Sequence, residues 1–342
     1  MILFRCKADA FTGMGHLVRC RVLADRLKTI GERCIMIGPS KAFQSQSDQL
    51  LFEAWMPRPD WVDSKTEAHF LIDTAKRAGV RYVILDDYRS DGEHQGILRD
   101  AGLVCLQQYD ASQPQKFAAN FVMNSSPAEQ LEMHTPNFLR PDIEMLLGPD
   151  YAIIRPEFLD INLQQKPKTP KRVLMTFGGG DDRGATAFCL EAFQADIAPD
   201  IQFVIMAGSS NPSIPTLAAW ATKLGPARIE LQISPGNVPS LINSCDAAIL
   251  SGGTTTFEAA YCGLPMLLMP IAANQYRQGE GWAALGAAIY LGPKATISIK
   301  MLQSEFSKFI SNQDQFLKMS QTARSAVDGQ GLDRVLKRFL KS

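Results

Sequence analysis

The sequence predicts an α/β protein of two domains, each built on a parallel β-sheet, with a cleft between them. The chain has 342 residues, which is more than one hydrophobic core usually supports. Short apolar runs typical of buried strands alternate with segments of helical periodicity, the pattern of βαβ units. A polar stretch with prolines separates these units into two series of similar spacing.

The first series predicts an N-terminal domain at residues 1–155. Its strands are expected at 2–4, 34–37, 82–85, 103–106 and 121–123, and its first helix at 18–27. Residues 156–171 are the best linker candidate, because the run from Gln164 to Lys171 is polar and contains two prolines. We therefore place the boundary between the domains there.

The second series predicts a C-terminal domain at residues 172–325. Its strands are expected at 172–176, 202–206, 229–231, 247–250, 266–268 and 288–291. Residues 326–342 are amphipathic and basic at the end, and we expect a terminal helix that packs back on the body.

Composition narrows the classes of partner. Lys plus Arg and Asp plus Glu number 35 each, so no net charge attracts nucleic acid. The aliphatic runs are too short for a membrane span. The seven cysteines form no Cys-x-x-Cys pair, which indicates free thiols in a reducing compartment and no structural zinc. With no signal-peptide pattern at the first residues, we expect a cytoplasmic protein.

The run from Gly13 to Cys20 places His16 where the first strand passes to the first helix. We expect His16 in a loop beyond the carboxyl end of a strand, where open α/β sheets bind ligands. An imidazole there suits proton transfer near neutral pH. The alternative is a structural or solvated histidine.

Two glycine-rich turns follow strands of the second domain. Gly178 and Gly179 follow the first of them and precede a helix expected near Thr186. Their backbone amides could approach a phosphate, with the helix dipole adding positive potential. A tight structural turn is the alternative, and the run lacks the Gly-Lys-Ser/Thr ending of a Walker loop.

The second turn holds Gly252, Gly253 and Thr254, with Glu258 about one helical turn later. These residues could surround a diphosphate, and the Glu258 carboxylate could accept both hydroxyls of a ribose. A helix-capping arrangement is the alternative. Further on, Asn274 and Gln275 offer two amides for sugar hydroxyls or acetamido groups, unless they form an ordinary polar loop.

Asp86 and Asp87 form an acidic pair at the end of an expected strand. Adjacent acids there could ligate a metal. Hydrogen bonding to loop amides is the commoner arrangement, and we therefore predict no metal site.

Taken in order, the motifs resemble those of the nucleotide-sugar hydrolases of pseudaminic acid biosynthesis, relatives of the MurG glycosyltransferases. The motifs are Gly-x-Gly-His-x-x-Arg-Cys, the run from Tyr151 to Phe158, Phe177-Gly178-Gly179, Gly252-Gly253-Thr254 with Glu258, Gly263-x-Pro265 and Asn274-Gln275. The resemblance covers nearly the whole chain. It implies the GT-B architecture, two Rossmann-like domains facing a cleft.

The resemblance also implies an activity and roles for residues. The substrate would be UDP-2,4-diacetamido-2,4,6-trideoxy-β-L-altropyranose, hydrolysed to UDP and the free sugar without metal or cofactor. His16 would activate water. The substrate-binding set would be Gly13, Gly15, Arg19, Tyr88, Asn274 and Gln275. The nucleotide-binding set would be Gly178, Gly179, Gly252, Gly253, Thr254 and Glu258, the last on the ribose.

One position departs from the family pattern. Family members commonly carry an Asp-Asp pair after the strand at 103–106, where this chain has Gln107 and Gln108. A related amino sugar is therefore an open alternative for the substrate. Two other functions also remain open: a glycosyltransferase using the same donor, and a non-catalytic protein that binds a nucleotide sugar.

Overall fold

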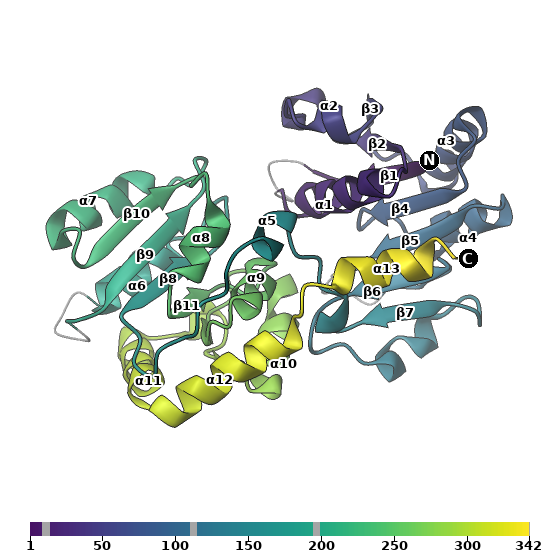
Figure 1. Cartoon of the computed structure of the whole chain (residues 1–342). Helices are drawn as coiled ribbons and strands as arrows, with labels where there is room; N and C mark the ends of the chain where they lie inside the picture. The colour runs from purple at the N-terminus through teal and green to yellow at the C-terminus, as the bar shows by residue number, and fades with distance from the viewer. Residues whose placement is uncertain (9–13, 110–114, 194–198, 342) are drawn as a thin grey trace. The chain divides into compact units, whose positions relative to one another are not determined.

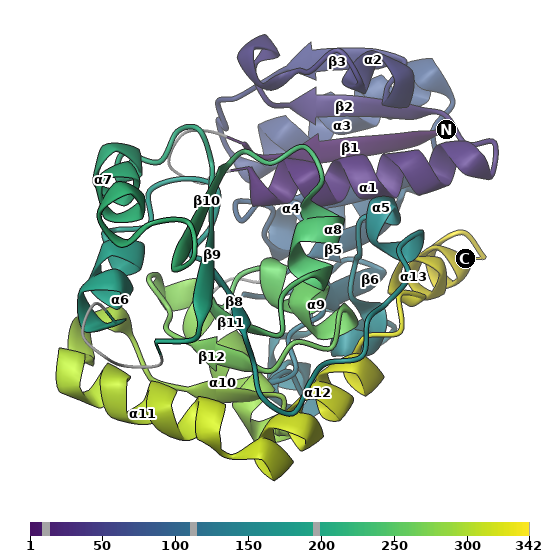
Figure 2. The same cartoon turned by 60° about the vertical axis from the view of Figure 1, so that its left-hand side comes forward.

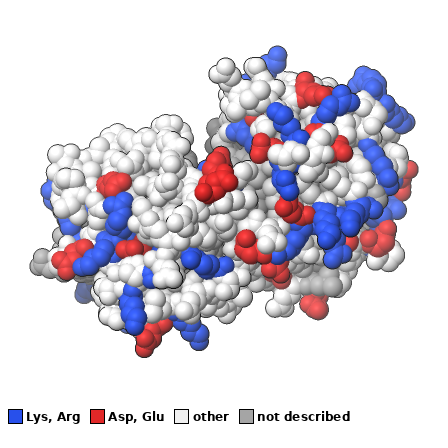
Figure 3. All heavy atoms as spheres, viewed as in Figure 1, with Lys and Arg blue, Asp and Glu red and all other residues white. Residues whose placement is uncertain are grey.

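The computed structural model describes residues 1–8, 14–109, 115–193 and 199–341. The chain folds into two compact units (Figure 1). Unit 1 comprises Met1–Arg155 together with Gln330–Ser342, and unit 2 comprises Pro156–Gly329. Within the described ranges, no helix is long and apolar enough to cross a bilayer. On the face seen in Figure 3, acidic and basic side chains are interspersed.

Unit 1 contains a seven-stranded parallel sheet in the order β3-β2-β1-β4-β5-β6-β7. The strands are β1 Ile2–Cys6, β2 Cys34–Gly38, β3 Ala54–Pro57, β4 Tyr82–Asp86, β5 Val104–Gln108, β6 Phe121–Asn124 and β7 Glu144–Leu147. The five predicted strands are confirmed. The two edge strands, β3 and β7, were missed because each has four residues and is only partly buried, so neither forms a long apolar run.

Helices cover both faces of this sheet, as Figure 2 shows. They are α1 Gly15–Thr29, α2 Asp48–Leu51, α3 Ser64–Ala78, α4 Gly92–Asp100 and α13 Gly331–Phe339, with 3₁₀ turns at Lys41–Phe43, Leu131–Met133, Thr135–Asn137 and Pro149–Tyr151. Side chains of β1 alternate between the faces. Phe4 packs with α1 and α13, and Leu3 packs with α3 and α4. We call these the α1 face and the α3 face.

Helix α3 shows how local sequence sets the ends of an element. The Asp63 carboxylate accepts a hydrogen bond from the Thr66 amide at 2.8 Å and caps the first turn. Gly79 ends the helix with a φ of 62°, in the left-handed region that favours glycine.

Unit 2 contains a six-stranded parallel sheet in the order β10-β9-β8-β11-β12-β13. The strands are β8 Arg172–Thr176, β9 Gln202–Ala207, β10 Ile229–Ile233, β11 Ala247–Leu250, β12 Met266–Leu268 and β13 Ala288–Tyr290, and all six were predicted. The helices are α5 Pro156–Leu159, α6 Ala185–Phe193, α7 Ile214–Leu224, α8 Val238–Asn243, α9 Thr255–Tyr261, α10 Tyr276–Leu285, α11 Ile299–Ser311 and α12 Gln313–Ala326, with 3₁₀ turns at Ala273–Gln275 and Lys294–Thr296. Phe193, Phe203 and Phe306 form an aromatic cluster in its core.

The segment at 156–171 begins unit 2. The Lys166 ammonium donates to the carbonyl oxygens of Asn243 and Cys245, both at 2.8 Å. The chain returns to unit 1 at Gln330, and Phe339 of α13 then packs edge-on against Tyr82, with ring centroids 5.2 Å apart. All seven cysteines are buried free thiols.

Both sheets reverse their strand order at one point. In unit 1 the chain runs outward from β1 to β2 and β3, then returns to place β4 on the other side of β1. In unit 2 the same reversal separates β8 from β11. Open α/β sheets bind ligands at the carboxyl ends of the strands beside such a switch point. Functional side chains are therefore expected at the ends of β1 and β4 in unit 1 and of β8 and β11 in unit 2.

Candidate functional site

His16 lies at the switch point of unit 1, but not in the predicted loop. It is the second residue of α1, which begins at Gly15 instead of at residue 18. The Val18 amide already donates to the Met14 carbonyl at 2.9 Å, so the first turn is helical. Met14 makes no side-chain cap, which is why the sequence carries no signal for this helix start. Only 5% of His16 is exposed to solvent.

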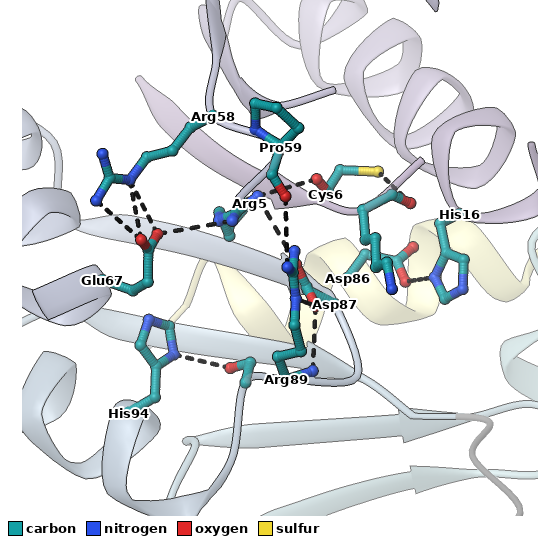
Figure 4. A network of polar contacts seen from close by, with 12 residues as sticks. Arg5, Cys6, His16, Arg58, Pro59, Glu67, Asp86, Asp87, Arg89 and His94 are labelled. Carbon is teal, nitrogen blue, oxygen red and sulfur yellow. Dashed lines mark hydrogen bonds and ion pairs between the residues drawn. The ribbon is translucent and has the colours of Figure 1, made fainter. Parts of the chain in front are cut away.

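The partner of His16 is Asp86, the last residue of β4. Nδ1 of His16 lies 2.5 Å from Oδ1 of Asp86. Figure 4 shows the two side chains pointing toward one another. The Arg19 guanidinium, one turn along α1, donates to both oxygens of the same carboxylate, at 2.5 and 2.6 Å. We expected Asp86 to accept from loop amides, and this was wrong. Instead, the carboxylate interacts with two side chains of α1, His16 and Arg19.

The charge of Asp86 fixes the tautomer of His16. Burial alone would raise the pKa of Asp86, but the charges of Arg19 and His16 and their hydrogen bonds outweigh it and hold that pKa well below its usual range. The carboxylate is therefore ionised at neutral pH and can only accept hydrogen bonds. Nη2 of Arg19 also lies 3.0 Å from Nδ1, but the contact to the Asp86 carboxylate is shorter and needs a donor. We therefore assign the proton to Nδ1, so that the neutral imidazole has its lone pair on Nε2.

Two further side chains contact the pair of His16 and Asp86. The Tyr88 ring packs edge-on against it, with centroids 4.7 Å apart and an interplanar angle of 83°. The Cys20 thiol lies 3.7 Å from Oδ2 of Asp86, and burial raises the pKa of this thiol well above its usual value. The structure thus brings together the predicted residues His16, Arg19 and Tyr88. Gly15 is exposed beside them, and Gly13 lies outside the described residues.

A buried charge network fixes the loop after β4 from the α3 face (Figure 4). Asp87 accepts from the Arg89 amide at 3.1 Å, as predicted for a loop amide, and from its guanidinium at 2.7 and 2.8 Å. Arg5, fully buried on β1, lies 3.7 Å from Asp87 and 3.6 Å from Glu67. Sequence reasoning missed this network, although a lone arginine inside an apolar strand was a signal for it.

The carboxylates of Asp86 and Asp87 form ion pairs with arginines. Among the described residues, no group of three His, Cys, Asp or Glu side chains is placed to hold a metal ion.

In unit 2, the glycine loop after β8 is followed by α6, whose first turn is capped by a side chain of the protein itself. Asp182 caps α6 by accepting from the Gly184 and Thr186 amides at 3.0 and 3.3 Å and from the Ser213 hydroxyl at 2.9 Å. A carboxylate of the chain thus already interacts with the positive end of this helix. Gly178, with a φ of 111°, and Gly179 would therefore meet a phosphate with their own amides and not with the helix dipole.

The loop after β11 is tied to α10. The Gly253 carbonyl accepts from the Gln278 amide at 2.9 Å, and the Thr256 hydroxyl accepts from the Trp282 indole at 3.0 Å. Thr254 precedes α9 without a side-chain cap, so the simple capping alternative does not describe this turn. Glu258 is the fourth residue of α9 and is half-buried.

The predicted amides lie beside this loop. A side chain at Gly252, whose φ is 110°, would approach the Gln275 carbonyl oxygen to 3.0 Å. Oε1 of Gln275 accepts from the Ile271 and Ala272 amides at 3.0 and 3.3 Å, which leaves its Nε2 group as the end that could meet a sugar. Asn274 is exposed in the same turn. The structure thus brings Gly252, Gly253 and Gln275 together at the second switch point.

These two units define a class of protein. The chain has the GT-B architecture of two Rossmann-like domains. Solved structures with this architecture superpose on the whole length of the chain. MurG of Acinetobacter baumannii superposes with a TM-score of 0.69 at 15% identity, covering 100% of this chain and 99% of that one. S. aureus MnaA, solved with UDP, gives a TM-score of 0.64 at 13% identity, covering 100% and 96%.

Sequence comparison finds proteins that are 24–26% identical to this chain, and no family model matches it. The spore coat polysaccharide biosynthesis protein SpsG of Bacillus subtilis is 26% identical over 337 residues, 94% of this chain and 93% of that protein. The UDP-2,4-diacetamido-2,4,6-trideoxy-β-L-altropyranose hydrolase of Campylobacter jejuni is 24% identical over 261 residues, 75% and 87% of the two chains. A Helicobacter pylori protein that joins this hydrolase to a pseudaminic acid cytidylyltransferase is 26% identical over 208 residues, 59% of this chain and 34% of that protein.

Proposed function

We propose that this chain is a hydrolase that cleaves UDP from UDP-2,4-diacetamido-2,4,6-trideoxy-β-L-altropyranose, or from a close amino-sugar relative, in nonulosonic acid biosynthesis. The observation that carries the proposal is the imidazole of His16, oriented by Asp86 so that Nε2 is the basic nitrogen. The names of the Campylobacter and Helicobacter relatives support the reaction and the substrate.

The proposed reaction is a displacement at the anomeric carbon. Nε2 of His16 takes a proton from water as the water oxygen bonds to C1, and the bond from C1 to the diphosphate oxygen breaks. UDP leaves with the electron pair. The Asp86 carboxylate stabilises the imidazolium that forms, as a buried acid does for a catalytic histidine. General-base assistance of this kind contributes about 10²–10⁴-fold to the rate.

The nucleotide end would be held by unit 2. Backbone amides at Gly252 and Gly253, with the hydroxyl of Thr254, would donate to the diphosphate and stabilise its developing charge. Amides at Gly178 and Gly179 would add to this, and Glu258 would accept from the ribose hydroxyls. No metal takes part in the proposed reaction.

The sugar end would be held mainly by unit 1. Tyr88 lies against the base, and Gly15 and Arg19 belong to the same helix turn. Asn274 and the Nε2 group of Gln275 would contact the sugar from unit 2.

A GT-B glycosyltransferase is the second candidate, favoured by the likeness to MurG. It would bind the same donor, and His16 would deprotonate an acceptor hydroxyl in place of water. A protein that binds a nucleotide sugar without turnover is a third reading of the same residues.

Free UDP released in the absence of any acceptor separates these functions. Rapid stoichiometric release from the diacetamido nucleotide sugar is expected for the hydrolase. Release that needs an added acceptor would identify a transferase, and no release would identify a binding protein. His16→Ala should lose turnover by about 10²-fold or more while keeping its affinity for UDP. His69→Ala, at an exposed histidine of α3, is the matched control and should keep the wild-type rate.

A further inference from the structure

Gln108 ends β5 on the strand next to Asp86. Strands β4 and β5 run parallel with Leu85 opposite Gln107, so the following residues, Asp86 and Gln108, project to the same face of the sheet. This is the α1 face, which also carries His16. On its other side, Gln108 is in register with Met123 of β6, which belongs to the apolar core of that face.

The side chain of Gln108 is buried, and its Nε2 atom has no hydrogen-bond partner among the described residues. This atom is shielded from solvent, and only 5% of the residue is exposed. Buried polar groups in proteins are nearly always hydrogen-bonded, so an exception calls for an explanation, of which a role in function is one. Among the described residues of unit 1, Arg5 and His94 also have such nitrogens, and both belong to the α3 face.

The neighbouring Gln107 provides an internal comparison. Its side chain points to the α3 face, where Oε1 accepts from Gln95 at 3.2 Å and Nε2 donates to the Gln108 carbonyl at 2.7 Å. Two residues of the same type, adjacent in sequence, are thus used differently. Both polar atoms of the Gln107 side chain have partners, whereas Nε2 of Gln108 has none in the part of the chain that the structure describes.

We propose that Gln108 determines specificity by donating from Nε2 to the carbonyl oxygen of an acetamido group on the sugar. This inference rests on the proposed function and names the part of the substrate that Gln108 would contact. An acetamido group matches both neighbours of the amide. Its carbonyl oxygen is a pure acceptor for the unpartnered Nε2, and its methyl group suits a face of the sheet on which the strand neighbour, Met123, is apolar. A neutral amide also adds no charge beside the paired Arg19 and Asp86.

The test replaces each glutamine by methionine, which has a similar length and no hydrogen-bonding amide. Binding is measured by calorimetry in the His16→Ala background, which suppresses turnover. The probes are UDP, UDP-glucose and UDP-2,4-diacetamido-2,4,6-trideoxy-β-L-altropyranose. UDP-glucose carries hydroxyls where the diacetamido sugar has acetamido groups. Thermal unfolding of each variant is recorded in parallel.

For Gln108→Met we expect an affinity for the diacetamido nucleotide sugar that is about 10- to 100-fold lower, with UDP and UDP-glucose unchanged. Its melting temperature should not fall, because an unsatisfied buried amide is replaced by an apolar group. Gln107→Met should show the reverse, a lower melting temperature and unchanged affinities. Equal affinity of Gln108→Met and its parent for the diacetamido sugar, or an equal loss for UDP-glucose, would overturn the inference.

These outcomes are separable from the fate of the proposed function. The wild-type chain could release no UDP and still bind the diacetamido nucleotide sugar more tightly when Gln108 is present. In that case the proposed hydrolase activity is wrong and the inference about Gln108 stands. If it hydrolyses the substrate and Gln108→Met behaves as its parent does, the inference fails alone. A chain that binds none of the three probes contradicts both.

Discussion

Nδ1 of His16 and Oδ1 of Asp86 lie 2.5 Å apart although 70 positions separate the two residues in sequence. The contact joins the first turn of α1 to the end of β4, across the switch point of the unit 1 sheet. It fixes the orientation of the ring, the nitrogen that carries the proton and the nitrogen that can accept one.

Replacing Asp86 by asparagine tests this orienting role. An asparagine amide can donate to Nδ1, which would move the ring proton to Nε2 and remove the base. We expect kcat to fall by about 10²–10⁴-fold, as in enzymes whose catalytic histidine loses its acid. The affinity for UDP, measured by calorimetry, should not change.

The same substitution leaves the Arg19 guanidinium without its carboxylate, so stability should fall by about 3–5 kcal/mol in the free energy of unfolding. Asp333→Asn, which disturbs an exposed pair with Arg26, is the control for a generic loss of charge. A wild-type kcat in a well-folded Asp86→Asn protein would show that the tautomer of His16 does not matter to the reaction.

Gly208→Ala tests the glycine loop after β8. A methyl group at Gly208 would collide with the backbone of Gly179, so the loop must shift. We expect a loss of about 1–3 kcal/mol in the free energy of unfolding and weaker binding of UDP. Gly236→Ala places its methyl group in open space and should change neither quantity. Lower stability with unchanged affinity for UDP would remove Gly178 and Gly179 from the nucleotide site.

Phe339→Ala tests how far α13 stabilises unit 1. The ring is fully buried and packs edge-on against Tyr82 and Phe121. Its removal should lower the stability of unit 1 by about 3–5 kcal/mol. Hydrogen exchange should show lost protection in peptides of β4 and β6 and none in peptides of β8 and β11. The exposed Lys337→Ala on the same helix is the control. An equal loss of protection in the two sheets would show that α13 stabilises unit 2 as much as unit 1.

His94 predicts a pH dependence of stability. It is fully buried, and burial lowers its pKa from 6.5 to about 4, with Arg5 adding to this and Asp91 and Asp87 opposing it. Between these pH values the unfolded chain binds more protons than the folded one, so stability is lost as the pH falls through this window. The loss amounts to about 3 kcal/mol. The contribution of Asp86, whose pKa is depressed, persists to lower pH.

Urea unfolding between pH 7 and pH 4 checks this prediction. His94→Asn keeps a polar atom near Ser90, which contacts Nδ1 of His94 at 2.9 Å, but cannot titrate. Its stability should decline less steeply than that of the wild type, whereas His69→Asn should follow the wild-type curve. Parallel curves for His94→Asn and the wild type would assign the acid sensitivity to other groups.

The central strands of both sheets could be predicted because burial on two faces leaves continuous apolar runs, as in 82–85 and 247–250. The edge strands β3 and β7 are short and partly exposed, so no such run marks them. The start of α1 was placed too late because Met14 contributes no capping side chain.

The sequence predicts His16 beside the end of the first strand, although in a loop, and Arg19 and Tyr88 were candidates only through the resemblance. In the structure, His16 and Arg19 lie three residues apart on one side of α1. Their shared partner Asp86 comes from a distant strand, and local patterns favoured loop amides for it instead. The contrast between Gln107 and Gln108 depends on which face of the sheet each side chain takes, and that becomes clear only once the strands are in register.

The polypeptide leaves unit 1 after Arg155 and re-enters it at Gln330, so unit 2 is an insertion within unit 1. On the ribosome, unit 2 is synthesised in one piece and can fold while unit 1 still lacks α13. Until residues 330–342 emerge, the apolar surface around Tyr82 and Phe121 that α13 covers has nothing to shield it. Because of this order of synthesis, unit 1, which carries His16, is the last to complete its fold. A nascent chain stalled in unit 2 would expose that apolar surface to chaperones.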